Sequence, residues 1–333
     1  MNPRVSAALT IAIALSVTSA LLVIWQLQPE PTDPRVTHIT VHAPTNRAAA
    51  ALADGRIFTW SLDDTAAPTT HLRATGGIND LEFSPNGLTL ATAASNLALA
   101  TWDRPTVPTY LRDDGANYGV ARYDHSATSL ATITGKGQIL ILDTTTRQPV
   151  TFCCTTIYSD LRWLPANRIV TAGHHPAVWN AATGQLIARL TPEREEMAMG
   201  PILIHPTRQL IFIGSQDGGI RAFHLTDYHQ TAASPRTPDW VETMALSPTT
   251  DWIAYAQRGK TVRWWTPATN EHREWPNTTT TSTLAFTPQG LLLTGTAAGR
   301  VEEWDPATRA RTRVWELSSA QARPNGPASV VRD

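Results

Sequence analysis

The sequence predicts an all-β fold, a β-propeller of seven four-stranded antiparallel blades, with one transmembrane helix before it. Two observations predict the propeller. Two series of landmark residues recur about every 40 residues, and the same pattern of strands repeats within each period. A third observation, a long uncharged apolar run near the start of the 333-residue chain, predicts the helix.

The landmark residues define the period. The first series marks a turn after an apolar strand, and its central residues are Pro44, Pro85, His125, Pro165, Pro206, Pro248 and Pro288. The second series marks the end of a later strand with a bulky side chain: Trp60, Trp102, Leu142, Trp179, Phe223, Trp265 and Trp304. Both series have the spacing of about 40 residues expected of a propeller blade. We therefore expect seven blades between residues 36 and 317, with the aromatic landmarks buried between neighbours.

Each period has the same internal pattern of strands. The residues two and four positions before the turn are apolar in six of the seven periods, as at Leu81 and Phe83. Such alternation is typical of a strand with one buried face. Two further strands follow, then a shorter polar strand that suits an outer edge, because polar edges resist pairing with other chains. The last polar strand, residues 311–317, lies inside its own repeat, so we expect the ring to close without strand exchange.

The repeat resembles the WD-repeat family in a degenerate form. The segments that carry the resemblance are FSPNGLTLATAASNLALATWD (83–103), GSQDGGIRAF (214–223) and TGTAAGRVEEWDPATRARTRVWEL (294–317). The eponymous dipeptide occurs only at residues 102–103 and 304–305, and the Gly-His pair expected before each first strand is missing. The family's buried His–Ser–Asp–Trp network is therefore not expected here. The resemblance covers residues 36–317 and implies a propeller that binds other proteins.

The N-terminal segment predicts a membrane anchor. Residues 5–27 carry no charge, follow Arg4 and contain Trp25 near their far end. As a helix this run would be about 34 Å long, enough for a bilayer core of about 30 Å. A cleaved signal peptide is the alternative, with Thr18 and Ala20 before the cut, but its apolar region spans only about 7–15 residues. We expect an uncleaved, single-pass signal-anchor that leaves the propeller on the periplasmic or extracellular side.

The predicted domain order follows from these features. A short tail at 1–4 precedes the transmembrane anchor at 5–27, and a Pro-rich polar linker spans 28–35. The seven-bladed propeller spans 36–317. Residues 318–333 are small and polar, contain Pro and Gly, and predict a loose C-terminal tail.

Composition and motifs point away from several functions. The formal net charge is −1, whereas nucleic-acid binding usually needs a basic patch, so no nucleic-acid partner is expected. The only two cysteines, Cys153 and Cys154, are adjacent; they are either two small strand residues or a strained disulfide. The chain has no HExxH, CxxC, GxSxG, GxGxxG or P-loop pattern. We expect no metal, no cofactor and no enzymatic activity.

Two long links between repeats are candidate recognition loops, because binding residues concentrate on loops held by a rigid scaffold. They are residues 191–200, with an acidic cluster, and residues 226–242. The second link carries Tyr228 and Trp240, residue types that are enriched at binding hot spots. The alternative is that Trp240 packs on blade six beside Trp252 and the link only spans a gap.

A third candidate contact is Trp264. It is adjacent to Trp265, and successive side chains of a strand point to opposite faces. One of the two should therefore point outward, where an exposed aromatic side chain suits a protein interface.

These features favour a non-catalytic protein-interaction scaffold, or an accessory subunit of an integral membrane complex. Seven repeats that pack on their neighbours form a stiff disc whose loop faces can dock a partner without chemistry. Two alternatives stay open, because propeller sites gather residues from several blades and leave no short motif. One is a propeller enzyme of the quinone-cofactor dehydrogenase or lactonase type. The other is a sensor that binds a small ligand in the central channel.

Overall fold

The computed structural model describes residues 33–64, 68–74, 77–101, 109–112, 114–152, 158–190, 200–257, 261–275, 281–317 and 330–331. The predicted anchor at 5–27 and both cysteines lie outside these ranges. In the described part of the chain, no helix is long and apolar enough to cross a membrane. The strands belong to one compact unit, Pro34–Asp333.

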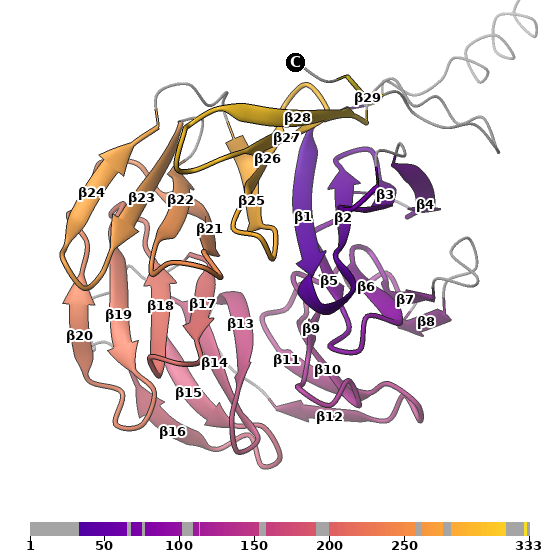
Figure 1. The fold of residues 1–333 in the computed structure, drawn as a ribbon. Helices are drawn as coiled ribbons and strands as arrows, with labels where there is room; N and C mark the ends of the chain where they lie inside the picture. Colours follow the sequence, from indigo (N-terminus) through magenta and orange to yellow (C-terminus); the bar gives the residue numbers. More distant parts are fainter. Residues whose placement is uncertain are drawn as a thin grey trace, which may run out of the picture. The chain divides into compact units, whose positions relative to one another are not determined.

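Seven antiparallel sheets follow one another along the described chain, as the sequence predicts (Figure 1). The first four blades are β1 (Val36–His42), β2 (Arg47–Leu52), β3 (Arg56–Ser61) and β4 (Thr69–Arg73); β5 (Asp80–Phe83), β6 (Thr89–Ala93), β7 (Leu97–Thr101) and β8 (Thr109–Arg112); β9 (Arg122–Tyr123), β10 (Ser129–Ile133), β11 (Ile139–Asp143) and β12 (Pro149–Phe152); β13 (Tyr158–Leu164), β14 (Arg168–Gly173), β15 (Ala177–Asn180) and β16 (Leu186–Arg189).

The remaining three blades have the same strand order. They are β17 (Ile202–His205), β18 (Leu210–Gly214), β19 (Ile220–His224) and β20 (Gln230–Ala233); β21 (Val241–Leu246), β22 (Ile253–Gln257), β23 (Val262–Thr266) and β24 (Glu271–Glu274); β25 (Thr281–Phe286), β26 (Leu292–Thr296), β27 (Arg300–Trp304) and β28 (Arg311–Glu316). A short strand from the predicted tail, β29 (Val330–Val331), pairs with β28 as a fifth strand of the last sheet.

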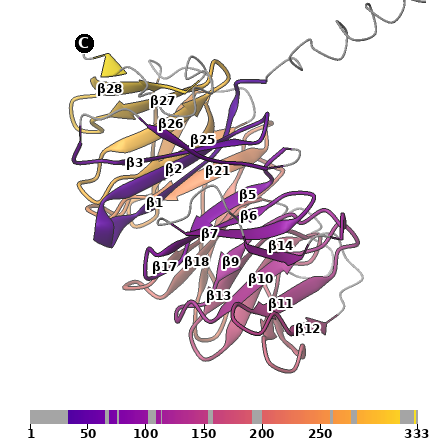
Figure 2. The ribbon, with the colours of Figure 1, turned by 90° about the vertical axis from the view of Figure 1, so that its right-hand side faces the viewer.

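The ring closes without strand exchange, as predicted, because each blade is built from consecutive strands. The first strands contact one another in chain order, and β1 contacts β25 (Figures 1 and 2). At this closure the backbone N–H of Ile39 donates to Thr283 Oγ1 at 3.2 Å. Farther out, Arg313 Nη1 donates to the carbonyl oxygen of Leu62 at 3.1 Å. Apolar side chains of blades one and seven form a shared cluster between these bonds.

The landmark turn needs a left-handed residue in most blades. Two positions after the turn centre, φ is positive at Asn46, Gly87, Ala127, Asn167 and Gly290. At Gly87 a Cβ atom would lie 2.5 Å from Cε1 of His42, a side chain of the preceding blade. The same histidine bonds the carbonyl oxygen of Pro85 through Nε2 at 3.0 Å. Glycine therefore lets this turn pack on blade one and adopt its φ of +69°.

The aromatic landmarks form the cores between blades, with one exception. Those that are buried, as predicted, are Trp60, Phe223, Trp265 and Trp304. Trp179 is only partly buried, against the cluster between blades three and four, so full burial was a wrong expectation there. Trp102 lies outside the described residues.

Candidate binding site in the central channel

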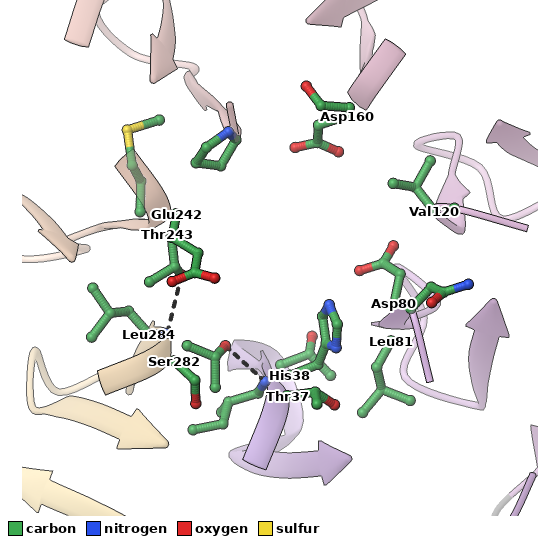
Figure 3. Close-up of a pocket in the computed structure, with 18 of the residues that line it drawn as sticks. Thr37, His38, Asp80, Leu81, Val120, Asp160, Glu242, Thr243, Ser282 and Leu284 are labelled. Atoms are coloured by element: carbon green, nitrogen blue, oxygen red, sulfur yellow. Dashed lines mark hydrogen bonds between the residues drawn. The ribbon is translucent and has the colours of Figure 1, made fainter. Parts of the chain in front are cut away.

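A cavity of about 830 Å³ lies where the first strands of the blades converge. Every blade lines it with the residue six positions before its landmark turn: His38, Asn79, Gly119, Ser159, Gly200, Glu242 and Ser282. Figure 3 shows side chains of different blades pointing toward the shared space, with Glu242 and Asp80 on opposite sides. The volume lies within the range of about 300–1,000 Å³ that is usual for ligand pockets.

The cavity opens at the end of the channel where the first strands begin. This end carries the links from each fourth strand to the next blade. Exposed lining residues here include Gly77, Gly119, Ser159, Trp240 and Glu242. Three of these side chains are absent or small, so the rim is not closed by bulky groups.

A buried ion network joins blades two, three and four at the cavity wall. Arg122 forms ion pairs with Asp80 and, at 3.1 Å through Nη2, with Asp160 Oδ1. The same carboxylates also accept backbone N–H groups of the next blade. Asp80 accepts from Ala121 at 2.8 Å, and Asp160 accepts from Ile202 at 2.9 Å. A buried ionic group is tolerated only when its hydrogen-bonding capacity is met, and these bonds meet it for both carboxylates.

Two threonines make the equivalent blade-to-blade bond elsewhere in the ring. Thr243 Oγ1 accepts from the N–H of Leu284 at 3.3 Å, drawn as a dashed line in Figure 3. Thr283 does the same for Ile39 at the closure. The four acceptors, Asp80, Asp160, Thr243 and Thr283, all lie five residues before their landmark turns. This position of the repeat therefore fastens each of these blades to the next around the cavity.

A second, more accessible ion pair crosses the face of blade three. Arg162 Nη1 lies 3.2 Å from Glu82 Oε1, and the two side chains are 29% and 25% exposed. Arg162 Nε also donates to the carbonyl oxygen of Ile202 at 3.2 Å. Glu82 Oε2 accepts from the N–H of Tyr123 at 2.8 Å. This pair connects blades two to five and lines the cavity.

Burial shifts the pKa values of three cavity groups. It raises the pKa of Glu82 to about 7, although the charge of Arg162 opposes the shift. It lowers the pKa of His38 to about 4, and the positive charge of Arg122 adds to that effect. Burial also lowers the pKa of Arg122 to about 9. At neutral pH, His38 is therefore uncharged, Arg122 is charged, and Glu82 is close to its titration midpoint.

Comparison with known proteins supports the fold. The structure is similar to the WD40 β-propeller domain of Doa1, with a TM-score of 0.67, and the match covers 80% of this chain and 91% of that domain. The fold is that of a WD40-type propeller. Sequence identity over the match is 13%, so the likeness is one of fold. No family model matches the chain, and no curated protein matches it. WD40-type propellers commonly serve as protein-interaction scaffolds.

Trp240 lies at the rim of this WD40-type channel. Its side chain is 51% exposed and lines the cavity, so the alternative of a core residue packed beside Trp252 is wrong. The link that carries it is shorter than expected, because residues 226–242 contain the edge strand β20. The sequence of that strand, QTAA, lacks the apolar alternation that would have marked it as a strand.

Tyr228 has a structural position at the other end of the same blade. It occupies the turn between β19 and β20 with a φ of +62°. The equivalent turns of other blades place Arg147, Gly184, Asn270 and Arg309 in the same left-handed conformation. Its hydroxyl accepts from Arg168 Nη1 at 2.5 Å, and its ring packs on the cluster between blades four and five. Since antiparallel strands separate the two turns, Tyr228 and Trp240 cannot form one contact surface.

Trp264 does not point outward. Its side chain is 5% exposed, stacks on Trp252 with ring centroids 5.4 Å apart, and meets Trp275 edge-on at 5.2 Å. The neighbouring Trp265 is also buried. Because a middle strand of a blade is covered on both faces by adjoining blades, alternation moves a side chain from one core to the other. The expectation of an exposed Trp264 was therefore wrong.

The sequence motifs did not identify the charged residues of the cavity. They lie three or five positions before the landmark turns of blades two to four: Asp80, Glu82, Arg122, Asp160 and Arg162. Charged residues that recur in otherwise apolar strands were a usable signal. The acidic cluster of the 191–200 link lies outside the described residues. Within the described ranges, no three His, Cys, Asp or Glu side chains could hold a metal ion.

Proposed function

We propose that the protein is a non-catalytic interaction scaffold, or an accessory subunit of a membrane complex, that is tethered through residues 5–27 on the exported side. The fold, commonly a scaffold for protein partners, supports the interaction role. The uncharged run of the N-terminal segment supports the tether. The partner docks on the face where the cavity opens.

One observation carries this proposal: Trp240 is an exposed aromatic side chain on a firmly held loop. On one side of it, Val241 donates its N–H to the carbonyl oxygen of Ser215 at 3.2 Å. On the other side, the carbonyl oxygen of Asp239 accepts from the buried Gln257 Nε2 at 2.8 Å. A held loop loses little conformational freedom when it binds, and tryptophan is enriched at binding hot spots.

The carboxylates of the channel also favour a non-catalytic role. Asp80 and Asp160 each hold both Arg122 and a backbone N–H of the next blade. These bonds engage the carboxylates in joining blades, whereas a general acid or base needs access to the reacting atoms. The enzyme alternative therefore has less support than the scaffold.

A capture experiment tests the proposal. The tagged full chain is purified from detergent-solubilised membranes, alongside Trp240→Ala and a matched control, Leu186→Ala, which removes an exposed apolar side chain on the outer edge strand β16. We expect Trp240→Ala to lose a stoichiometric partner at unchanged melting temperature, while Leu186→Ala retains it. Equal recovery of the partner with both variants would place the docking surface elsewhere.

A small-ligand sensor is the second candidate, and the volume of the cavity favours it. The two functions differ in what co-purifies. A scaffold retains a protein partner, whereas a sensor retains a small molecule that native mass spectrometry detects and that Trp240→Ala releases.

A further inference from the structure

We propose that the channel receives a lysine or arginine side chain of the partner, whose cationic group lies between Trp240 and Glu242 at the rim. This inference rests on the proposed function, since it takes the partner to be a protein that docks on this face. It adds the chemistry of the partner's anchoring residue.

Glu242 is the first reason. It is exposed at the rim, lines the cavity, and lies across it from Asp80 (Figure 3). Among the charged cavity-lining side chains, it alone has no ion pair or hydrogen bond with the described residues. Arg35, the cation of the rim, already interacts with another group. A carboxylate without a partner beside a cavity favours a cationic ligand.

The charge balance of the whole lining is the second reason. Its carboxyl groups are Asp80, Glu82, Asp160 and Glu242, and its guanidinium groups are Arg35, Arg122 and Arg162. With the pKa of Glu82 at about 7, this carboxyl group is only partly ionised at neutral pH, and the lining carries a small net negative charge. His38 does not restore the balance, because its pKa of about 4 leaves it uncharged at neutral pH. When Glu82 is ionised, one added positive charge makes the lining neutral. An acidic partner side chain would instead increase the imbalance.

The indole of Trp240 is the third reason. A cation over the face of tryptophan is attracted by the ring quadrupole, and this attraction is stronger for indole than for other aromatic rings. The indole lies two residues before Glu242 on the same firmly held segment, so the backbone that carries both groups is in place before binding. The small, exposed rim residues Gly77, Gly119 and Ser159 leave space for a long side chain to enter.

The ionisation of Glu82 makes the affinity for a cation depend on pH, and this dependence provides an independent test of the site. The groups around Glu82 on the packed strands are Asp80 on β5, His38 on β1, Arg122 and Tyr123 on β9, and Asp160 and Arg162 on β13. A bound cation favours the ionised form of Glu82, whose pKa is about 7. Binding therefore releases a proton, and affinity rises as pH increases from 6 to 8.

Calorimetry with short capped peptides tests the inference. The full chain in detergent is titrated with acetyl-Gly-Gly-Arg-Gly-Gly-amide, its lysine and glutamate counterparts, and the uncharged citrulline counterpart. We expect binding of the arginine and lysine peptides, and affinity at least about fivefold weaker for citrulline. Glu242→Gln and Trp240→Ala should each weaken arginine binding, and Trp240→Phe should retain part of it. Glu271→Gln, at an exposed carboxylate of the outer strand β24, is the matched control and should change nothing.

Several outcomes would overturn the inference. They are equal binding of citrulline and arginine, tighter binding of the glutamate peptide, equal affinity of Glu242→Gln and Glu271→Gln, or no saturation by about 10 mM peptide. Glu82→Gln should remove the rise of affinity with pH while keeping arginine binding; a retained rise would assign the proton to another group. If partner capture still depends on Trp240 but no cationic peptide binds, the scaffold stands and this inference fails.

Discussion

His38 and Glu82 should give the protein two opposite pH dependences that nearly cancel. The pKa of Glu82 is raised from 4.5 to about 7 in the folded state, and that of His38 is lowered from 6.5 to about 4. Each difference is near 2.5 pH units, which corresponds to up to about 3 kcal/mol of folding free energy. Partial exposure of Glu82 makes this an upper bound for that group.

The signs follow from which state holds the proton more tightly. The folded state holds the proton of Glu82 more tightly than the unfolded state. The stabilising contribution of Glu82 is therefore full below pH 4.5 and is lost as pH rises to 7. The unfolded state holds the proton of His38 more tightly than the folded state. The stabilising contribution of neutral His38 is therefore full above pH 6.5 and is lost as pH falls to 4. The two slopes overlap between about pH 4.5 and 6.5 and have opposite sign. Neither group contributes to the shift of the other.

Single substitutions should reveal each slope. Glu82→Gln leaves His38 alone, so this variant should lose up to about 3 kcal/mol relative to wild type between pH 7 and 4.5. His38→Asn leaves Glu82 alone and should gain stability over the same interval. Urea unfolding of the full chain at four pH values, followed by tryptophan fluorescence, measures both. Parallel curves for the wild type and Glu82→Gln would refute the assignment of a raised pKa to this carboxyl group.

Three further predictions test the anchor, a turn and Tyr228. The chain should fractionate with membranes and become soluble on deletion of residues 1–30, whereas a mature N-terminus near Leu21 would indicate a cleaved signal peptide. Gly87→Ala should destabilise the folded protein by about 1–3 kcal/mol more than Gly115→Ala does. Both glycines have a φ of +69°, but only a Cβ at Gly87 meets His42. Equal midpoints of urea unfolding for the two variants would contradict the clash. Tyr228→Phe should cost about 1 kcal/mol through the lost bond to Arg168 and leave partner capture unchanged; loss of the partner would reinstate Tyr228 as a contact.

The propeller was predictable from the sequence because its determinants repeat. A bulky residue closing the third strand, as at Trp265, and a turn that needs positive φ, as at Gly87, occur at fixed places in the period. The site was not predictable in the same way, because it depends on differences between repeats. The residue five positions before the landmark turn is Asp in blades two and four, whereas it is Val120 in blade three. Only the closed ring shows that such unlike residues share one cavity.

Local alternation was misleading where two faces of a strand are equally buried. Trp264 and Trp265 point to opposite faces of their strand, and each face packs in a different core between blades. The adjacency of the two residues therefore does not predict that either side chain is exposed. Trp240 differs because it precedes the first residue of β21, where the chain has left one blade and not yet entered the next. Exposure of an aromatic residue in a propeller is therefore better predicted from its position in the blade-to-blade link than from alternation within a strand.

Closure of the ring uses the same contact that joins neighbouring blades elsewhere. Thr283 binds the N–H of Ile39 as Thr243 binds that of Leu284, and Trp60 meets Trp315 in the cluster between blades seven and one with ring centroids 5.4 Å apart. Because this interface resembles the others, the ring needs no strand from the N-terminal segment to hold its first and last blades together. Blade one is complete from Val36 onward. Residues 36–316 therefore supply all four strands of each blade that the structure describes.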